Sequence, residues 1–140
     1  MTINPFAGDR ITLTTFRDDD LTQFAHWLSN FDLQRMVNPG MNAPFNPDDL
    51  NDPNGWFQQG LKSEESRTFA VRTRTDDTFI GMCALINIDR FSHHAEIGIN
   101  IADPDYQGKG YGGEIMRLLI RYGFDQFNLH RIYLRVMSYN

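Results

Sequence analysis

The sequence predicts a single α/β (α+β) domain built around one sheet, on three observations. Five segments alternate apolar and polar residues as strands do, and three others repeat apolar residues at helical spacing. A glycine-dense stretch joins the fourth strand segment to the last helical one. The order is β, α, α, β, β, β, α, β, and 140 residues fit one domain with a core of its own. No repeat or linker divides residues 1–140.

The first strand is predicted at residues 10–16, which are rich in β-branched residues. Asp18, Asp19 and Asp20 then open a helix, where acids suit the N-cap and the positive helix end. Attraction of a basic substrate is the alternative interpretation of these aspartates. The helix itself is predicted from apolar residues at helical spacing, Leu21, Phe24, Ala25 and Leu28.

The middle of the chain predicts a loop, a short helix and a hairpin. Residues 38–54 are dense in Pro, Asn, Asp and Gly and predict a loop, and residues 56–61 predict a short helix. Residues 68–75 and 78–89 predict the hairpin, with its turn at Asp76–Asp77 and a bulge at Gly81. His93 and His94 lie in the next turn. They are a poor metal site, because the sequence offers no third or fourth ligand at usable spacing.

The C-terminal part predicts a strand, a loop, a helix and a last strand. Ile97, Ile99 and Ile101 share one face of the strand at 95–101. A helix follows Gly112 and ends at Asn128, and residues 131–137 alternate as the last strand.

The loop between that strand and helix predicts an anion site. Residues 108–113 contain four glycines, which allow several backbone N–H groups to converge on one anion at the positive end of a helix. A diphosphate is the expected ligand. The Rossmann fingerprint lacks its acidic residue near Leu129, and the P-loop pattern fails because Gly110 follows Lys109. A glycine-rich turn without a ligand is the remaining alternative.

The motif Gln107-x-x-Gly110-x-Gly112 resembles the pyrophosphate signature of the GNAT acetyltransferases. Ala-Glu-Ile-Gly at 95–98 and the residues at 103–107 look most like the branch of ribosomal-protein N-terminal and polyamine acetyltransferases. The resemblance implies a mostly antiparallel sheet with helices on both faces, splayed between the fourth and fifth strands. It also implies acetyl-CoA as cosubstrate, bound by residues of the fourth strand and the loop: Ile99, Asn100, Ile101, Gln107, Gly108, Lys109, Gly110, Tyr111 and Gly112.

The resemblance further implies direct acetyl transfer to a primary amine of a peptide N-terminus, a polyamine or a small molecule. Glu96, eleven residues before Gln107, is the candidate general base, with a structural carboxylate as the alternative. Direct transfer implies no covalent intermediate, so Cys83 is not needed as a nucleophile. It is expected to be a small buried residue of the hydrophobic core. The acceptor pocket would be walled by aromatic and Met residues for which core packing is the alternative: Trp27, Met41, Phe45, Trp56 and Phe57.

The C-terminal end resembles the beginning of a GNAT segment whose Asn contacts CoA, here Asn140. The helix and closing strands expected after it are absent, so the domain is predicted to be C-terminally incomplete. The resulting exposed edge of the last strand predicts a homodimer that covers it.

The formal net charge of −5 favours cationic partners and disfavours nucleic acid. The N-terminus lacks a signal pattern and no stretch approaches a membrane span, which predicts a cytoplasmic protein without membrane contact. Two other functions stay open beside the enzyme: a non-catalytic acyl-CoA-binding or assembly module, and a nucleotide-binding regulatory domain.

Overall fold

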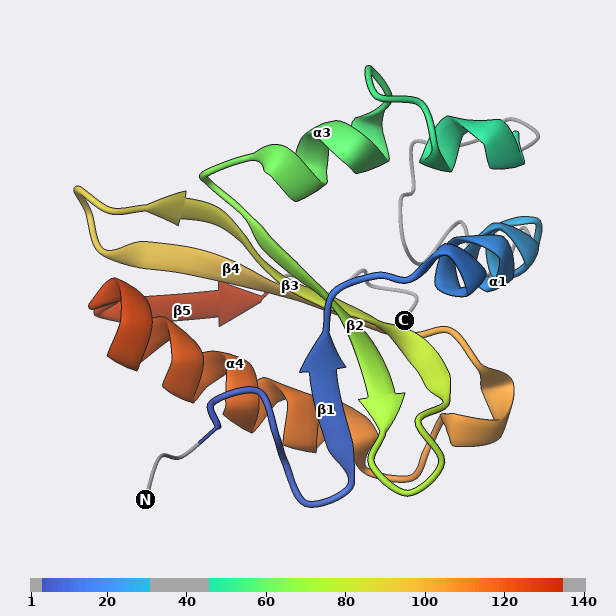
Figure 1. Cartoon of the computed structure of the whole chain (residues 1–140). Coiled ribbons are helices and arrows are strands. Elements are labelled where there is room, and N and C mark those ends of the chain that lie inside the picture. The colour runs from blue at the N-terminus through green and yellow to red at the C-terminus, as the bar shows by residue number, and fades with distance from the viewer. Residues whose placement is uncertain (1–3, 31–45, 135–140) are drawn as a thin grey trace.

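A computed structural model describes residues 4–30 and 46–134. They form one five-stranded sheet in the order β1-β2-β3-β4-β5 (Figure 1). The first four strands pair antiparallel, and β5 pairs parallel with β4. The predicted mostly antiparallel sheet is therefore confirmed. The strands are β1 (Ile11–Thr14), β2 (Arg67–Thr73), β3 (Phe79–Asp89), β4 (His94–Ile101) and β5 (Arg131–Leu134).

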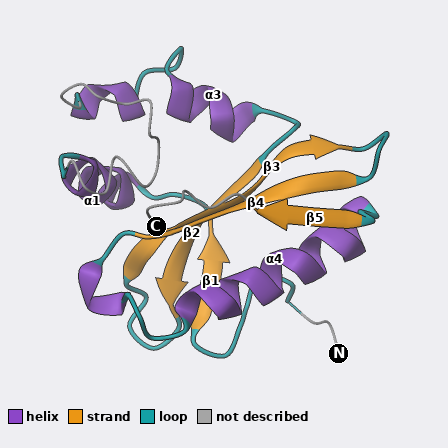
Figure 2. Ribbon diagram, turned by 180° about the vertical axis from the view of Figure 1, so that it is seen from behind, coloured by secondary structure: helices purple, strands orange, loops and turns teal. Residues whose placement is uncertain are grey.

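In the part of the chain that the structure describes, three α-helices cover the two faces of this sheet, and helices on both faces were predicted. The long helix α4 lies on one face, and α1 and α3 lie on the other (Figures 1 and 2). Within residues 4–30 and 46–134, the predicted order of strands and α-helices is confirmed. The helices are α1 (Asp18–Leu28), α3 (Trp56–Lys62) and α4 (Tyr111–Phe127), with 3-10 turns η1 (Pro47–Leu50) and η2 (Pro104–Tyr106). None of the described helices has the length and apolarity that crossing a bilayer requires.

Each face of the sheet has its own apolar core, because strand side chains alternate between faces. Under α4, odd-numbered β4 residues such as Ile97 join Leu85 of β3 and Leu119 of α4. Under α1 and α3, Phe24 and Phe57 pack with Ala70 of β2. Cys83 is buried in the α4 core, as expected from the sequence, and this burial raises the pKa of its thiol well above the ordinary value.

The predicted irregularity at Gly81 is confirmed. The pairing of β2 with β3 shifts between Val71 and Arg72, so Ile80 is an extra residue in β3 next to Gly81. The carbonyl of Ile80 accepts hydrogen bonds from the backbone N–H groups of Ala102 and Asp103, at 3.0 and 3.2 Å. A side chain at Gly81 would collide with the backbone of β4. The bulge therefore determines where β4 ends and the loop toward α4 begins.

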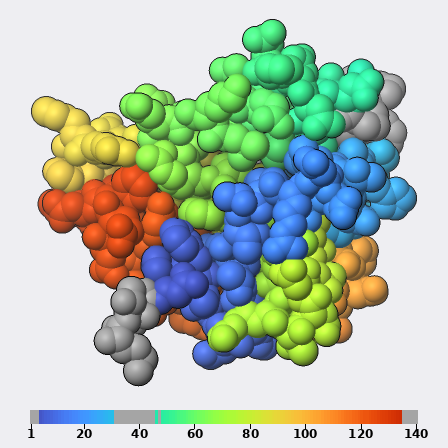
Figure 3. Space-filling model, in the orientation of Figure 1, coloured from blue at the N-terminus to red at the C-terminus, as the bar shows by residue number. Residues whose placement is uncertain are grey.

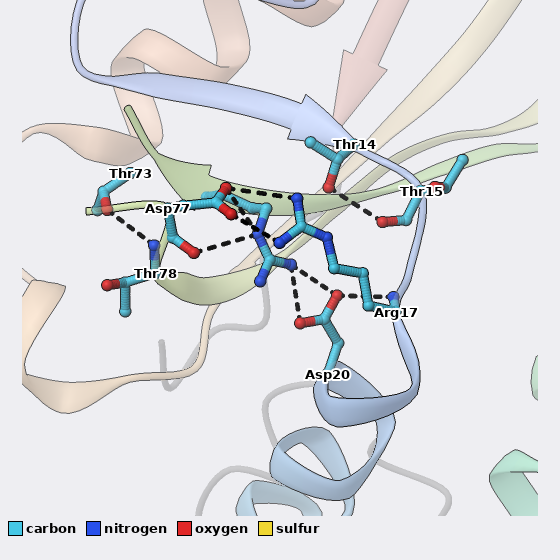
Figure 4. Close-up of polar contacts among 8 residues, drawn as sticks. Thr14, Thr15, Arg17, Asp20, Thr73, Asp77 and Thr78 are labelled. Carbon is cyan, nitrogen blue, oxygen red and sulfur yellow. Dashed lines mark hydrogen bonds and ion pairs between the residues drawn. The ribbon is translucent and has the colours of Figure 1, made fainter. Parts of the chain in front are cut away.

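The three aspartates open α1 and lie in its first turn, as predicted, although none of them is the N-cap residue. The residue before the helix is Arg17, and Asp20 lies in the first turn and accepts the backbone N–H of Arg17 at 2.8 Å. Asp20 is also buried and forms an ion pair with Arg72 of β2 at 2.7 Å (Figure 4). Asp77 of the β2–β3 turn binds Arg17 at 2.7 Å. Asp20 is therefore a buried structural group and does not attract a substrate.

Among the described elements, the end of β1 differs from the sequence expectation. β1 ends at Thr14 instead of continuing to Phe16, because the chain turns there to enter α1. Asn128 ends α4 with a left-handed φ of 52°, as predicted. The last strand is described only to Leu134, so the predicted continuation to Met137 and the splay between β4 and β5 lie outside the described residues.

Candidate functional site

The loop between β4 and α4 is anchored at both ends. The side chain of Asp103 accepts the backbone N–H of Asp105 at 3.0 Å and so begins the 3-10 turn η2. The side chain of Gln107 donates from Nε2 to the carbonyl of Ile101 at 2.8 Å. Gln107 therefore ties the loop back to the end of β4, and its side-chain amide supports the loop in this structure.

The glycines of the loop adopt conformations that other residues avoid. Gly108 and Gly110 have φ of +71° and +85°, in the left-handed region. Gly110 immediately precedes the first residue of α4. Within the described chain, none of the backbone N–H groups of residues 110–113 donates a hydrogen bond. These are the N–H groups that a helix leaves unsatisfied at its N-terminus, and here they are available to an anion.

Space for that anion is present at the loop. A Cβ built on Gly108 or Gly112 would have no heavy atom of the described residues within 4 Å. Two basic side chains lie nearby: Lys109 within the loop, and Arg117, whose Nη1 is 3.7 Å from a Cβ built on Gly113. The loop therefore has the room, the donors and the positive charge that a diphosphate requires.

A third basic residue reaches the loop from the other end of the chain. Arg10, just before β1, donates from Nη1 to the carbonyl of Lys109 at 3.0 Å. Its guanidinium carbon lies 4.2 Å from the centre of the Tyr111 ring. Its Nη2 is 3.4 Å from a Cβ built on Gly110. Figure 3 shows the N-terminal segment (dark blue) directly beside the orange-red atoms of the C-terminal part.

Glu114, in the first turn of α4, holds Arg10 in this position. Its Oε2 lies 3.0 Å from Nε of Arg10, and its Oε1 accepts the backbone N–H groups of Arg10 and Ile11 at 2.7 and 3.3 Å. Burial alone would raise the pKa of the Glu114 carboxyl, but these N–H groups and the guanidinium outweigh it and lower the pKa below the ordinary value. Glu114 is therefore ionised and structural, and cannot act as an acid near neutral pH.

β4 presents different groups on its two faces and its edge. The side chains of Ile99 and Ile101 pack in the core under α4. Pairing with β5 involves only residues 94–97, so no described residue pairs with β4 on that side from Gly98 onward. Ile99, Asn100 and Ile101 therefore lie on an edge of β4 that is unpaired within the described structure, and alternate residues of this stretch present their backbone groups along it.

Glu96 lies on the opposite face from α4 and is 8% exposed. Its Oε2 is 3.2 Å from Nδ2 of Asn87, which adopts a left-handed φ of 51° at the end of β3. Glu96 also neighbours Ile86 of β3 and Tyr133 of β5 in the sheet register. Its burial and its amide partner are compatible with either of the roles predicted for it, base or structural carboxylate.

The expected walls of the acceptor pocket are only partly described. Trp27 packs on Phe79 with ring centroids 5.1 Å apart, and Phe57 is buried, so both serve the core under α1 and α3. Trp56 is 48% exposed. Met41, Phe45 and the predicted CoA contact Asn140 lie outside the described residues. The described part of the chain contains no cluster of His, Cys, Asp or Glu that could hold a metal ion.

Sequence reasoning missed Arg10, Glu114 and Asn87 as parts of the site. Glu114 and Arg10 are 104 positions apart, and no local pattern links them. An acid in the first turn of a helix is ordinarily interpreted through the helix dipole alone. The only available signal was a glutamate following four glycines, which is too common to identify its partner.

Known proteins that resemble this chain are acetyltransferases. A family model described as an acetyltransferase (GNAT) domain matches residues 10–140. The spermidine N(1)-acetyltransferase of Vibrio cholerae is 30% identical over 134 residues, which are 95% of this chain and 73% of that protein. The probable N-acetyltransferase YjcK of Bacillus subtilis is 33% identical over 84 residues, which are 60% of this chain.

Solved structures show the same fold. The crystal structure of the Vibrio cholerae spermidine N-acetyltransferase in complex with CoA and spermine superposes with a TM-score of 0.76 at 27% identity. This match covers 93% of the present chain and 73% of that one. The part aligned with YjcK is 46% of the length of that protein. These relatives are thus longer than the region they share with the present chain.

Proposed function

Because this chain belongs to the acetyltransferase (GNAT) domain family, whose members use acetyl-CoA, we propose that it transfers the acetyl group of acetyl-CoA to a primary amine. The observation that carries the proposal is the loop at residues 107–113. Its glycines adopt left-handed φ values, and the N–H groups of residues 110–113 are open to an anion at the start of α4. This arrangement suits the diphosphate of CoA.

We assign the cofactor-binding roles accordingly. The backbone of Gly108, Gly110 and Gly112 receives the diphosphate, and Lys109 adds a positive charge. Tyr111 and Gln107 belong to the same site, the first beneath Arg10 and the second as the anchor of the loop to β4. The predicted contribution of Asn140 stays a prediction.

The acyl arm would then run from the loop along the edge of β4. Ile99, Asn100 and Ile101 line this edge, and those of their backbone groups that point away from β3 can hydrogen-bond an extended arm. Glu96 lies five residues before Ile101, about 16 Å at ~3.3 Å per residue. A diphosphate at the loop and a reacting thioester near Glu96 would therefore be separated by the length of the strand.

Glu96 is the proposed general base. The amine lone pair attacks the thioester carbonyl carbon, the C–S bond breaks, and CoA leaves as a thiolate that takes up a proton. The proton lost by the amine passes to the Glu96 carboxylate, directly or through a water molecule. Donors aimed at the carbonyl oxygen stabilise the negative charge that develops on it.

The acceptor is proposed to be a cationic amine. The chain carries a net charge of −5, which attracts cations. The Vibrio cholerae relative described above is a spermidine acetyltransferase, and its structure is solved with CoA and spermine, so polyamines are the first amines to examine. Peptide N-termini and small amines complete the panel. The homodimer covering β5, on which Leu134 is 44% exposed, and the cytoplasmic location stay predictions.

The test has a binding arm and a turnover arm. CoA should raise the melting temperature, whereas ATP and NAD at equal concentration should not. Thiol release from acetyl-CoA should then require an amine, and Glu96→Gln should lower kcat by about 100-fold or more, the range expected for loss of a general base. Unchanged turnover in Glu96→Gln would remove Glu96 from this role.

The same experiment identifies the alternatives. Stabilisation by CoA with no thiol release for any amine would indicate a non-catalytic acyl-CoA-binding module. Stabilisation by ATP or NAD instead of CoA would indicate a nucleotide-binding regulatory domain. Absence of any effect of CoA would contradict the assignment of the loop.

A further inference from the structure

The face of β4 that points away from α4 carries two polar residues with a small residue between them. Ile99 and Ile101 pack under α4, so Glu96, Gly98 and Asn100 share the other face. In the pairing with β3, these three residues lie opposite Ile86, Ala84 and Met82, respectively. Glu96 and Asn100 are therefore separated along one face by a pair of small residues.

Space exists above that small pair. A Cβ built on Gly98 would meet no heavy atom of the described residues within 4 Å. Ala84, its neighbour on β3, adds only a methyl group to the same surface. Residues four apart on a strand are about 13 Å apart at Cα, so Glu96 and Asn100 leave room between their side chains for a few heavy atoms.

Asn100 supplies an unused donor at one end of this space. Its Nδ2 is buried and has no hydrogen-bond partner among the described residues. A buried amide without a partner is destabilising, and native proteins keep few of them. At the other end of this space, the carboxylate of Glu96 accepts a hydrogen bond from Asn87. Glu96 therefore has a hydrogen-bond partner for its side chain, whereas the Nδ2 of Asn100 has none among the described residues.

We propose that the side chain of Asn100 donates a hydrogen bond from Nδ2 to a carbonyl oxygen of the bound acyl-CoA, in the space above Gly98. This inference rests on the proposed acetyltransferase function and goes beyond it, because that function requires only the backbone of Asn100. Glu96 and Asn100 then face the reaction from opposite sides, one as proton acceptor and the other as hydrogen-bond donor.

The carbonyl has two sources, which predict different kinetics. If it is the thioester carbonyl, negative charge grows on its oxygen during attack, and loss of the donor lowers kcat. If it is an amide carbonyl of the pantetheine arm, the bond is equally strong before and during the reaction. Loss of the donor then weakens the affinity for CoA and raises KM without changing kcat.

The experiment compares Asn100→Leu and Asn100→Ala with the wild type. Leu removes the unpaired amide and fills its volume, so its melting temperature without ligand should stay equal or rise by a few degrees. Turnover should fall in both variants, by about tenfold or more in kcat/KM. A loss of turnover in Asn100→Ala as well as in Asn100→Leu would show that the missing hydrogen bond is the cause, because alanine adds no volume.

Thr68→Val is a matched control. Thr68 lies on β2 opposite Ala84, on the same face of the sheet as Asn100. Its replacement by valine, like the Asn100 substitutions, exchanges a polar side chain for an apolar one. Its turnover and its affinity for CoA should equal those of the wild type. A loss as large as that of the Asn100 variants would show that any polar-to-apolar change on this face impairs the enzyme, and would overturn the assignment.

Two further results would overturn the proposal. Turnover and CoA affinity within twofold of the wild type in both Asn100 variants would mean that Nδ2 touches no substrate. A clear fall in the ligand-free melting temperature of Asn100→Leu would mean that the amide stabilises the fold. Failure of the proposed function has a different signature, since the wild type itself would then show no effect of CoA.

Discussion

Arg10 and Glu114 meet at the cofactor loop although 104 positions separate them in the chain. The backbone N–H of Arg10 donates to Oε1 of Glu114 at 2.7 Å, and its Nε donates to Oε2 at 3.0 Å. The same guanidinium binds the carbonyl of Lys109 at 3.0 Å. The N-terminal segment therefore supports the loop and also brings a positive charge to it.

Arg10→Ala should weaken CoA binding by about tenfold. The variant loses the hydrogen bond to the Lys109 carbonyl and one positive charge beside the loop, and a hydrogen bond to a charged group contributes about 1.5–3 kcal/mol. Isothermal titration with CoA at neutral pH gives the affinity directly. Arg10→Lys should recover part of it, since an ammonium keeps the charge but not the forked geometry.

Arg74→Ala is the matched control for that loss. The guanidinium of Arg74 also binds the N-terminal segment, at the Gly8 carbonyl at 2.8 Å, but has no described contact with the loop. Its removal changes the net charge by the same amount. Equal losses of affinity in the Arg10 and Arg74 variants would mean that only overall charge matters, against a specific role for Arg10.

Gly110→Ala and Gly110→Asp should both impair CoA binding, the second far more. The φ of +85° at Gly110 strains any other residue by about 1 kcal/mol or more. Asp also places a negative charge where the diphosphate is proposed to bind, so its affinity should fall below detection. Affinities can be measured by titration, with folding checked by circular dichroism.

Gly113→Ala tests whether any added methyl group near the loop has the same effect. Gly113 lies inside α4, and its Cβ would make only an ordinary contact with Arg117 at 3.7 Å. Alanine is favoured over glycine in a helix by about 0.5–1 kcal/mol, so this variant should bind CoA normally and be more stable. Normal affinity in Gly110→Asp would contradict the loop assignment.

The contribution of Glu114 to stability should disappear in acid. Its pKa in the folded protein is lowered from 4.5, so its contribution is fully present above the pKa of the unfolded chain. It is lost progressively as the pH falls below about 4.5 toward the folded pKa. Urea unfolding from pH 3 to 7 should therefore show the wild type and Glu114→Gln converging at low pH. A difference that is constant over this range would contradict an ionised Glu114.

Arg72→Met should destabilise the fold by about 3–5 kcal/mol. It leaves the carboxylate of Asp20, 2% exposed, without its ionic partner at the junction of α1 and β2 (Figure 4). Chemical denaturation measures the change. Arg17→Ala removes the exposed pair with Asp77 and should change stability little. Similar losses of unfolding free energy in the two variants would mean that the burial of the Asp20–Arg72 pair does not determine its contribution to stability.

The sequence by itself determined the elements and the loop. Periodicity and turn residues are local properties, and they predicted the five strands and three α-helices that the described residues form, in the same order. The four glycines were likewise expected to allow the loop an unusual backbone, and the left-handed φ values of Gly108 and Gly110 agree with this. Local patterns succeed here because the forces that produce them act between residues close together in the chain.

Only the tertiary structure decided which distant residues meet. Alternation along β4 already predicted that Glu96, Gly98 and Asn100 share one face, but only the packed structure buries the Nδ2 of Asn100 and places Gly98 beside Ala84 of β3. The packing of α4 brings Glu114 to Arg10, and the packing of α1 on the other face brings Asp20 to Arg72. Such contacts depend on pairing and burial across the whole sheet, for which no short stretch of sequence carries a signal.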